Sequence, residues 1–429
     1  MTDSIASKSA NAHRFVVAGV FLLAFITIVD RVCISSAQLN IAEDLRIPDI
    51  QFGWVFGAFT LGYAAFMIPG GWCADFFRPR GVLTTVVCCW SLFTVWTGSV
   101  NTLEQLIVVR LMFGLAEAGA YPGATRALYG WVPASERGIS LGLLNAGSRL
   151  GAAVGLPIAS YVILWLGWRN CFRALGSLGI IWAFGWFLWY RNSPTRPADA
   201  NRERSRARIT PECQEADVAS TARSITSRWS PILFSRSGAM LLFQYFANNF
   251  SYFLAYSWML PYLERRFNLT PSRAGLYSGI PMWGGIIATS LGGVIVDRLF
   301  RRGYGGWSRA FPAIIGFGIA AFGVLLAGTA QEPLWSILGF GGAVFGLDLT
   351  VSSSWALSID LGRDHAGAIS GAMNMAGAIG SFGCALAFPY ILQRTGGEVA
   401  FFVLAAILNA GGAVTWYRLS KRIPVLPVE

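Results

Sequence analysis

Seven ionisable residues lie inside long apolar stretches of this 429-residue chain: Asp30, Arg31, Arg110, Glu117, Arg126, Arg149 and Asp348. A charged side chain in an apolar stretch is costly, so it usually meets a partner or faces a water-filled cavity. Guanidinium groups can bind carboxylates, and buried carboxyl groups can take up and release protons. Six of the seven precede residue 150, so we expect charge chemistry mainly in the first half of the chain.

The spacing of these residues limits how they can meet. Arg110 and Glu117 are two helical turns apart, about 10 Å along the axis, so both can face one cavity. Asp30 and Arg31 are adjacent, so one is expected to face the cavity while the other meets a neighbouring helix. An acid would neutralise an Arg in the empty state, and a substrate carboxylate would replace that acid. The alternative is a static charge cluster that holds helices together.

Long apolar segments must position these residues. The chain is 54% hydrophobic and only 13% charged. Segments of about 20 apolar residues match the thickness of a bilayer core, and in lipid they must be helical. The sequence therefore predicts an all-α membrane protein with twelve transmembrane helices, over 15–36, 51–73, 82–100, 103–129, 137–166, 169–190, 232–262, 272–297, 309–329, 333–358, 366–393 and 397–420.

Arg-rich connections alternate with shorter, nearly neutral ones, which places both termini in the cytoplasm. We expect a multi-pass protein of the plasma (inner) membrane, with its first span retained. Its predicted parts are a cytoplasmic N-terminus (1–14), an N-terminal six-helix half (15–190), a polar cytoplasmic linker (191–230) and a C-terminal six-helix half (231–422).

The two halves share a turn of the form Gly-x-x-x-Asp followed by Arg. It runs from Gly71 to Asp75 in the first half and from Gly293 to Asp297 in the second. Such duplication is typical of transporters whose site lies between the repeats. Each Asp can pair with Arg across the cytoplasmic face and must separate from it when that face opens. The residues predicted to control this gating are Asp75, Arg80, Asp297 and Arg298.

Longer motifs resemble the major facilitator superfamily, and within it the anion:cation symporter group. They include Asp30-Arg31, Pro69-Gly-Gly-Trp72, Trp131-Val-Pro-Ala-Ser-Glu136-Arg137-Gly138 and, most discriminating, Arg110-Leu-Met-Phe-Gly-Leu-Ala-Glu117-Ala-Gly-Ala-Tyr-Pro122. That group includes sugar-acid carriers and vesicular glutamate and sialic-acid carriers. The resemblance implies proton-coupled symport of a small organic anion, a sugar acid or another carboxylate, by alternating access.

Candidate site residues follow from the spans and the resemblance together. Asp30 and Glu117 are expected to couple protons. The substrate is expected to contact Arg31, Tyr63, Arg110, Ser148, Arg149, Gln244, Ser354, Trp355 and Asn374. Ser148 stands where sugar-acid carriers often have an amide. Arg149 and Asp348 are atypical: they could bind a second carboxylate, carry a proton or pair across the halves.

Other functional classes fit less well. Gly138-Ile-Ser140-Leu-Gly142 matches a nucleophile elbow, but it opens a membrane helix, so no enzyme is predicted. The two His residues are far apart in sequence, so no metal site is expected, and the proton gradient replaces any cofactor. The net charge of +11 is spread over loops, which argues against nucleic acid. The expected partners of a monomer are an organic anion, protons and lipid. A uniporter, an anion exchanger and a non-transporting ligand sensor remain alternatives.

Overall fold

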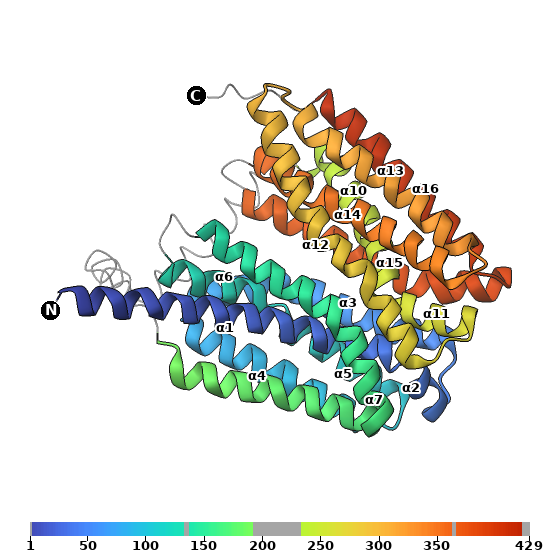
Figure 1. The fold of residues 1–429 in the computed structure, drawn as a ribbon, viewed down its shortest axis with the longest axis horizontal. Helices are drawn as coiled ribbons and strands as arrows, with labels where there is room; N and C mark the ends of the chain where they lie inside the picture. The colour runs from blue at the N-terminus through green and yellow to red at the C-terminus, as the bar shows by residue number, and fades with distance from the viewer. Residues whose placement is uncertain (1, 133–136, 192–232, 363–365, 423–429) are drawn as a thin grey trace.

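The computed structural model describes residues 2–132, 137–191, 233–362 and 366–422, and its helices form two bundles (Figure 1). The N-terminal bundle comprises α1 (Thr2–Ser36), α2 (Gln38–Asp44), α3 (Asp49–Phe76), α4 (Pro79–Thr97), α5 (Leu103–Glu117), α6 (Ala120–Trp131) and α7 (Arg137–Trp189). The C-terminal bundle comprises α10 (Arg236–Phe253), η2 (Leu254–Trp258), α11 (Met259–Phe267), α12 (Pro271–Arg301), α13 (Trp307–Thr329), α14 (Pro333–Gly362), α15 (Ala366–Thr395) and α16 (Val399–Ser420). The linker predicted over 191–230 lies, apart from Arg191, outside the described residues.

These helices make twelve membrane spans, which confirms the predicted fold class. Within the described ranges, nine helical segments are individually long and apolar enough to cross a bilayer. One of them, in α7, contains two spans, because Gly167 (φ 74°, ψ 161°) breaks the helix at the predicted boundary. The remaining two spans are composite. One joins α5 to α6, and the other joins α10, the π-helical segment η2 and α11.

The span predicted over 103–129 is interrupted, because α5 ends at Glu117 and α6 begins at Ala120. The interruption lies against the neighbouring helix α3. A Cβ atom added at Gly70 would lie 3.1 Å from the amide nitrogen of Gly119. Small residues allow such close backbone approach between membrane helices. The interruption places the Glu117 side chain at a helix end in the interior of the bundle.

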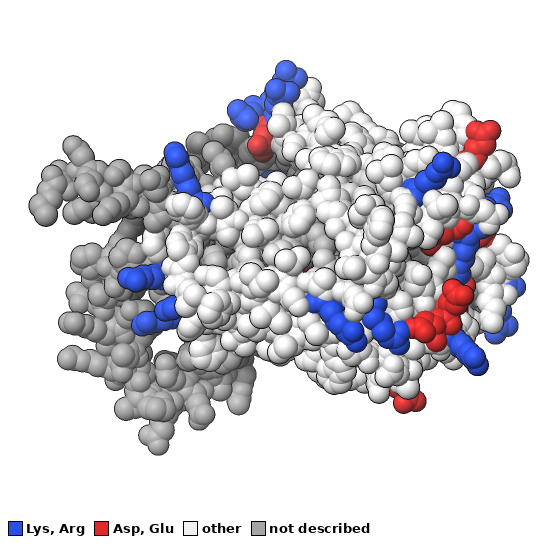
Figure 2. All heavy atoms as spheres, turned by 60° about the horizontal axis from the view of Figure 1, so that its bottom comes forward, with Lys and Arg blue, Asp and Glu red and all other residues white. Residues whose placement is uncertain are grey.

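The surface of the described helices has the character of a membrane protein. Large apolar side chains are exposed along them, including Trp165, Ile181 and Phe322. Figure 2 shows Lys, Arg, Asp and Glu gathered toward the ends of the molecule, with an uncharged band between them. In water such an apolar surface would be unfavourable, whereas in a bilayer it contacts lipid. The chain is therefore an integral, multi-pass membrane protein.

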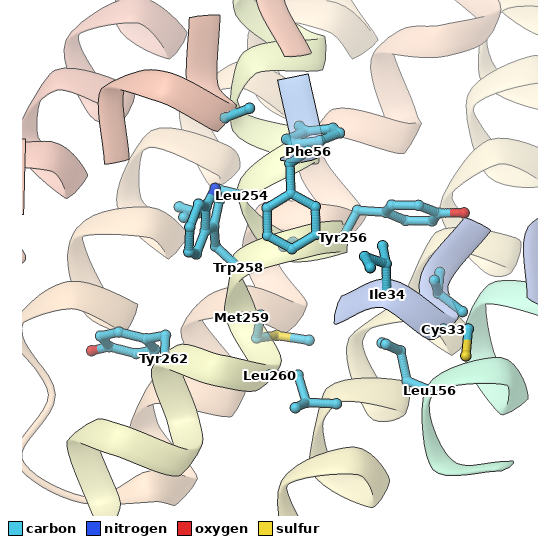
Figure 3. Close-up of a cluster of buried hydrophobic side chains, with 14 of the residues drawn as sticks. Cys33, Ile34, Phe56, Leu156, Leu254, Tyr256, Trp258, Met259, Leu260 and Tyr262 are labelled. Carbon is cyan, nitrogen blue, oxygen red and sulfur yellow. The ribbon is translucent and has the colours of Figure 1, made fainter. Parts of the chain in front are cut away.

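The two bundles share a hydrophobic core at one end only. One buried cluster combines residues of both bundles, including Phe56 of α3 and Trp258 of η2 (Figure 3). The ring centroids of Phe56 and Trp258 are 4.9 Å apart, and Trp258 lies 4.9 Å from Phe388 of α15. The other two clusters each belong to a single bundle. The shared core lies at the end away from the chain termini, near α2 and α11 (Figure 1).

Glycines and an ion pair strengthen this closed end. A Cβ atom at Gly53 of α3 would lie 2.7 Å from the carbonyl oxygen of Ala385 in α15, so these two helix backbones touch. Gly279 of α12 packs in the same way on α7. On the surface, Arg265 of α11 forms an ion pair with Asp49 at the start of α3. The bundles are thus joined at the end away from the termini and have separate cores at the other end.

Candidate functional site

The centre of the N-terminal bundle holds an ion pair between Arg31 of α1 and Glu117 of α5. The Glu117 side chain is fully buried, whereas the Arg31 side chain is 20% exposed. The Arg31 guanidinium lies over the rings of Phe59 and Tyr63, with distances of 4.8 and 5.0 Å to their centroids. The cation can therefore be reached from outside the bundle interior, while its acidic partner is enclosed.

Arg110 is more deeply buried than Arg31, with 3% exposure. Its guanidinium lies 5.1 Å from the ring centroid of Phe59 and 4.9 Å from that of Phe113. Its Nε atom has no hydrogen-bond partner among the described residues. Phe59 thus contacts the guanidinium groups of both Arg31 and Arg110, and the negative face of the ring favours both cations. The structure brings the two predicted carboxylate-binding residues to one aromatic ring.

Asp30 points away from Arg31, toward α4. The indole nitrogen of Trp90 donates a hydrogen bond of 3.2 Å to Oδ2 of Asp30. The other oxygen, Oδ1, is buried and accepts no hydrogen bond from the residues that the structure describes. An unsatisfied buried carboxylate oxygen is costly. The part of Asp30 in proton coupling stays a prediction.

A second Arg–acid pair crosses between the bundles. Arg149 of α7 forms an ion pair with Asp348 of α14 and donates a hydrogen bond to the hydroxyl of Tyr252. The Arg149 side chain is 23% exposed and that of Asp348 is 1% exposed. Gly285 of α12 packs directly against the Asp348 carboxylate, where a Cβ atom would collide with it. Of the three roles left open for these residues, the structure shows pairing across the halves.

Tyr121 of α6 contacts Ser148 of α7, the residue before Arg149. Its hydroxyl is 2.6 Å from Oγ of Ser148. The ring of Tyr256 stacks on that of Tyr252, with centroids 6.2 Å apart, and its buried hydroxyl has no hydrogen-bond partner within the described ranges. Hydroxyl groups thus lie next to the Arg149–Asp348 pair.

The candidates in the C-terminal bundle are arranged differently. Oε1 of Gln244 accepts hydrogen bonds from Ser354 Oγ at 3.0 Å and from Trp416 Nε1 at 3.2 Å. Gln244 and Ser354 are both fully buried. Trp355, the next residue of α14, is 39% exposed, and Asn374 is half-buried in α15. The structure therefore joins Gln244 and Ser354 to each other but brings neither Trp355 nor Asn374 to them.

The predicted gating residues lie at the helix ends on the side of the termini. Asp75 belongs to the last turn of α3, and its side chain lies outside the described part of the structure. Arg80 donates a 2.8 Å hydrogen bond to the carbonyl of Phe187, and its guanidinium lies 4.4 Å from the centroid of the Phe187 ring. Asp297 and Arg298 are exposed at the end of α12. Their part in gating stays a prediction.

Several residues around the Arg31–Glu117 and Arg149–Asp348 pairs were not predicted from the sequence. They are Phe59, Trp90, Tyr121, Tyr252 and Tyr256. Tyr252 and Tyr256 are four residues apart, so they share one helix face, which is a signal that the sequence does contain. Phe59 and Trp90 carry no such signal, because isolated aromatic residues are common in membrane helices. Within the described ranges, no three His, Cys, Asp or Glu residues are grouped so that they could hold a metal ion.

Comparison with known proteins agrees with this architecture. The Major Facilitator Superfamily model matches residues 20–385. A probable sulfoacetate transporter of Cupriavidus necator is 30% identical, over 94% of this chain and 93% of that protein. A probable galactarate/D-glucarate transporter of Escherichia coli is 27% identical, over 99% and 98% of the two chains.

A solved structure shows the same fold. It is a bacterial homologue of the human lysosomal transporter Spinster in an inward-facing, unoccupied conformation. The two structures align with a TM-score of 0.78 at 17% identity, over 96% of this chain and 98% of that one. The family match covers most of the chain, and the curated relatives are named as transporters, not as enzymes. The chain belongs to the Major Facilitator Superfamily and is a membrane transporter.

Proposed function

We propose that the protein is a proton-coupled symporter of a small organic anion. The observation that carries this proposal is the pair of Arg31 with Glu117, in which the cation is partly exposed and the acid is enclosed. An incoming anion can reach the guanidinium and take the place of the acid. The relatives named as probable transporters of sulfoacetate and of galactarate/D-glucarate support an anionic substrate.

Binding and protonation are linked by this exchange of partners. When the substrate anion binds Arg31 and Arg110, Glu117 loses its ionic partner. A buried carboxylate without a partner is costly, so the carboxyl group takes up a proton. Asp30, with one unsatisfied oxygen, is the second candidate for a proton. Two such carboxyl groups would titrate as a coupled pair.

The arrangement of the cores supports alternating access. The shared aromatic core closes one end, and the separate cores at the other end leave room for the bundles to move apart. With both termini in the cytoplasm of the cell, as the distribution of Arg residues favours, the structure corresponds to an inward-facing state. Asp75, Arg80, Asp297 and Arg298 would control the return to the opposite state. The hydroxyl and amide groups of Gln244, Ser354 and Asn374, with Trp355, would contact the body of the substrate.

The Glu117→Gln variant tests the coupling, because glutamine resembles the protonated acid. In proteoliposomes we expect it to exchange labelled for unlabelled substrate but to lose accumulation driven by a pH gradient. Glu104→Gln is a matched control, since Glu104 lies exposed in the first turn of the same helix. The control should keep both activities. If Glu117→Gln still accumulates substrate in response to the pH gradient, Glu117 is not the coupling residue.

The anion-binding step has its own test. Arg110→Lys keeps the charge but loses the planar group that pairs with a carboxylate and stacks on Phe59 and Phe113. We expect this variant to lose most of its substrate binding, measured by calorimetry. Wild-type affinity in this variant and in Arg31→Gln would show that the anion is bound elsewhere.

A further inference from the structure

We propose that the transported substrate carries two anionic groups, and that the second one binds Arg149 in place of Asp348. This inference rests on the proposed function, in which Arg31 and Arg110 bind the first anionic group. It assigns a role to the ion pair of Arg149 with Asp348, which joins the two bundles and takes no part when an anion binds only at Arg31.

The two Arg–acid pairs share one design. In each pair the acid is enclosed, with 0% exposure for Glu117 and 1% for Asp348. In each pair the guanidinium is partly exposed, at 20% for Arg31 and 23% for Arg149. A mobile anion can therefore approach either cation from its open side, while neither acid is accessible in the same way. Both pairs are suited to the same exchange of a carboxylate for an anion of the substrate.

The two cations lie on adjacent helices, near one helix contact. A Cβ atom added at Gly151 of α7, two residues after Arg149, would lie 3.1 Å from Cβ of Ile28 in α1, three residues before Arg31. The Tyr121 hydroxyl and Ser148 form a hydrogen-bonded pair next to Arg149. Tyr252 contacts Arg149 through its hydroxyl and its ring, whose centroid lies 5.3 Å from the guanidinium. Hydroxyl groups next to Arg149, with Arg31 on the adjacent helix, match a short, polar molecule with an anionic group at each end.

The position of Asp348 gives this exchange a mechanical consequence. Asp348 belongs to α14 of the C-terminal bundle, and Arg149 belongs to α7 of the N-terminal bundle. Gly285 of α12, also in the C-terminal bundle, packs against the carboxylate. An anion that takes Arg149 therefore removes an ionic link between the bundles. A molecule with one anionic group satisfies Arg31 and Arg110 and leaves that link intact.

Pairs of ligands that differ in one charged group test the proposal. Galactarate and galactonate have the same carbon chain and differ by one carboxylate, and sulfoacetate differs from 2-hydroxyethanesulfonate in the same way. In calorimetry with the purified full-length protein, we expect the dianion of at least one pair to bind at least about tenfold more tightly. In the double variant Arg149→Gln/Asp348→Asn the preference should vanish, while binding of the monoanion stays within about twofold.

Two further variants separate this site from general effects on folding. Asp348→Asn keeps Arg149 and removes its competitor, so it should bind the dianion at least as tightly as the wild type does. Arg169→Gln/Asp44→Asn removes a partly exposed ion pair within the N-terminal bundle, between α7 and α2, and should keep the full preference.

The outcomes distinguish the inference from the proposed function. If the monoanion and the dianion bind the wild type equally well, or if the double variant keeps the preference, the second anion site is wrong while anion binding stands. If the wild type binds none of the four anions, the proposed organic-anion function itself fails.

Discussion

Replacing Phe56 by Ala is expected to open the end of the protein that lies away from the chain termini. Phe56 is 2% exposed and belongs to α3 of the N-terminal bundle. Two of its ring neighbours lie in the C-terminal bundle: Trp258 at 4.9 Å and Phe253 at 6.3 Å between centroids. These contacts exist only while this end is closed. Their loss therefore destabilises the closed arrangement relative to the one open at this end.

The size of the effect follows from the number of lost ring pairs. Each aromatic pair contributes about 0.5–1.5 kcal/mol beyond the burial of its area, so two pairs contribute about 1–3 kcal/mol. A free-energy change of that size alters the ratio of the two states by about 5- to 150-fold. The core of each separate bundle is affected less, because only one of the three ring neighbours of Phe56, Phe52, lies in its own bundle.

The assay is a distance measurement between spin labels on the two bundles. Glu104 of α5 and Glu332, which precedes α14, are exposed and suit labelling after replacement by cysteine in a background without native cysteines. Phe56→Ala should increase the population with a long distance between the labels. Phe340→Ala is the control, since Phe340 is fully buried but its ring partners Tyr262 and Phe402 belong to its own bundle. An unchanged distance distribution in Phe56→Ala, or an equal shift in the control, would refute the reasoning.

Three further predictions concern the same end of the protein. Gly279→Ala should increase the long-distance population in the same assay, because the added methyl group meets the backbone of α7. Arg265→Gln should shift the same equilibrium less than Phe56→Ala does, and less at high salt, since its ion pair with Asp49 is exposed and screened. The Arg169 guanidinium lowers the pKa of Asp44 below its usual 3.8. The pair therefore stabilises the fold at pH values above 3.8, and this stabilisation is lost as the pH falls through the lowered pKa. Asp44→Asn should therefore show a smaller loss of melting temperature between pH 5 and pH 3, measured by calorimetry, and an unchanged loss would contradict this.

The number and order of the spans could be predicted from the sequence, because lipid requires long apolar segments to be helical. Gly167 marks the boundary between two spans that otherwise form one continuous helix, and its positive φ agrees with the predicted break. The interruption after Glu117 could not be predicted in the same way. It lies against Gly70 of another helix, and the sequence alone does not show which helices pack together.

The ionisable residues of the candidate site could also be predicted, but their partners could not. A charge in an apolar span is visible in the sequence, whereas its partner depends on how distant helices pack. From the sequence, Arg31 and Arg110 were equivalent candidates for the ionic partner of Glu117. In the structure Arg31 pairs with Glu117, while Arg110 stacks on phenyl rings. The ion pair of Arg149 with Asp348 joins residues of different bundles that are almost 200 positions apart in the sequence.

The buried charges of the two clusters have an electrical consequence. Arg31, Arg110 and Arg149 are matched by Asp30, Glu117 and Asp348, so the set carries no net charge when all six are ionised. A charge that crosses the membrane field gains or loses about 2.3 kcal/mol per 100 mV. With all six ionised, the empty carrier should therefore change state at a rate that does not depend on voltage. A dianion accompanied by two protons would move equally without current. A measured current per transported molecule would thus count the protons that accompany the substrate.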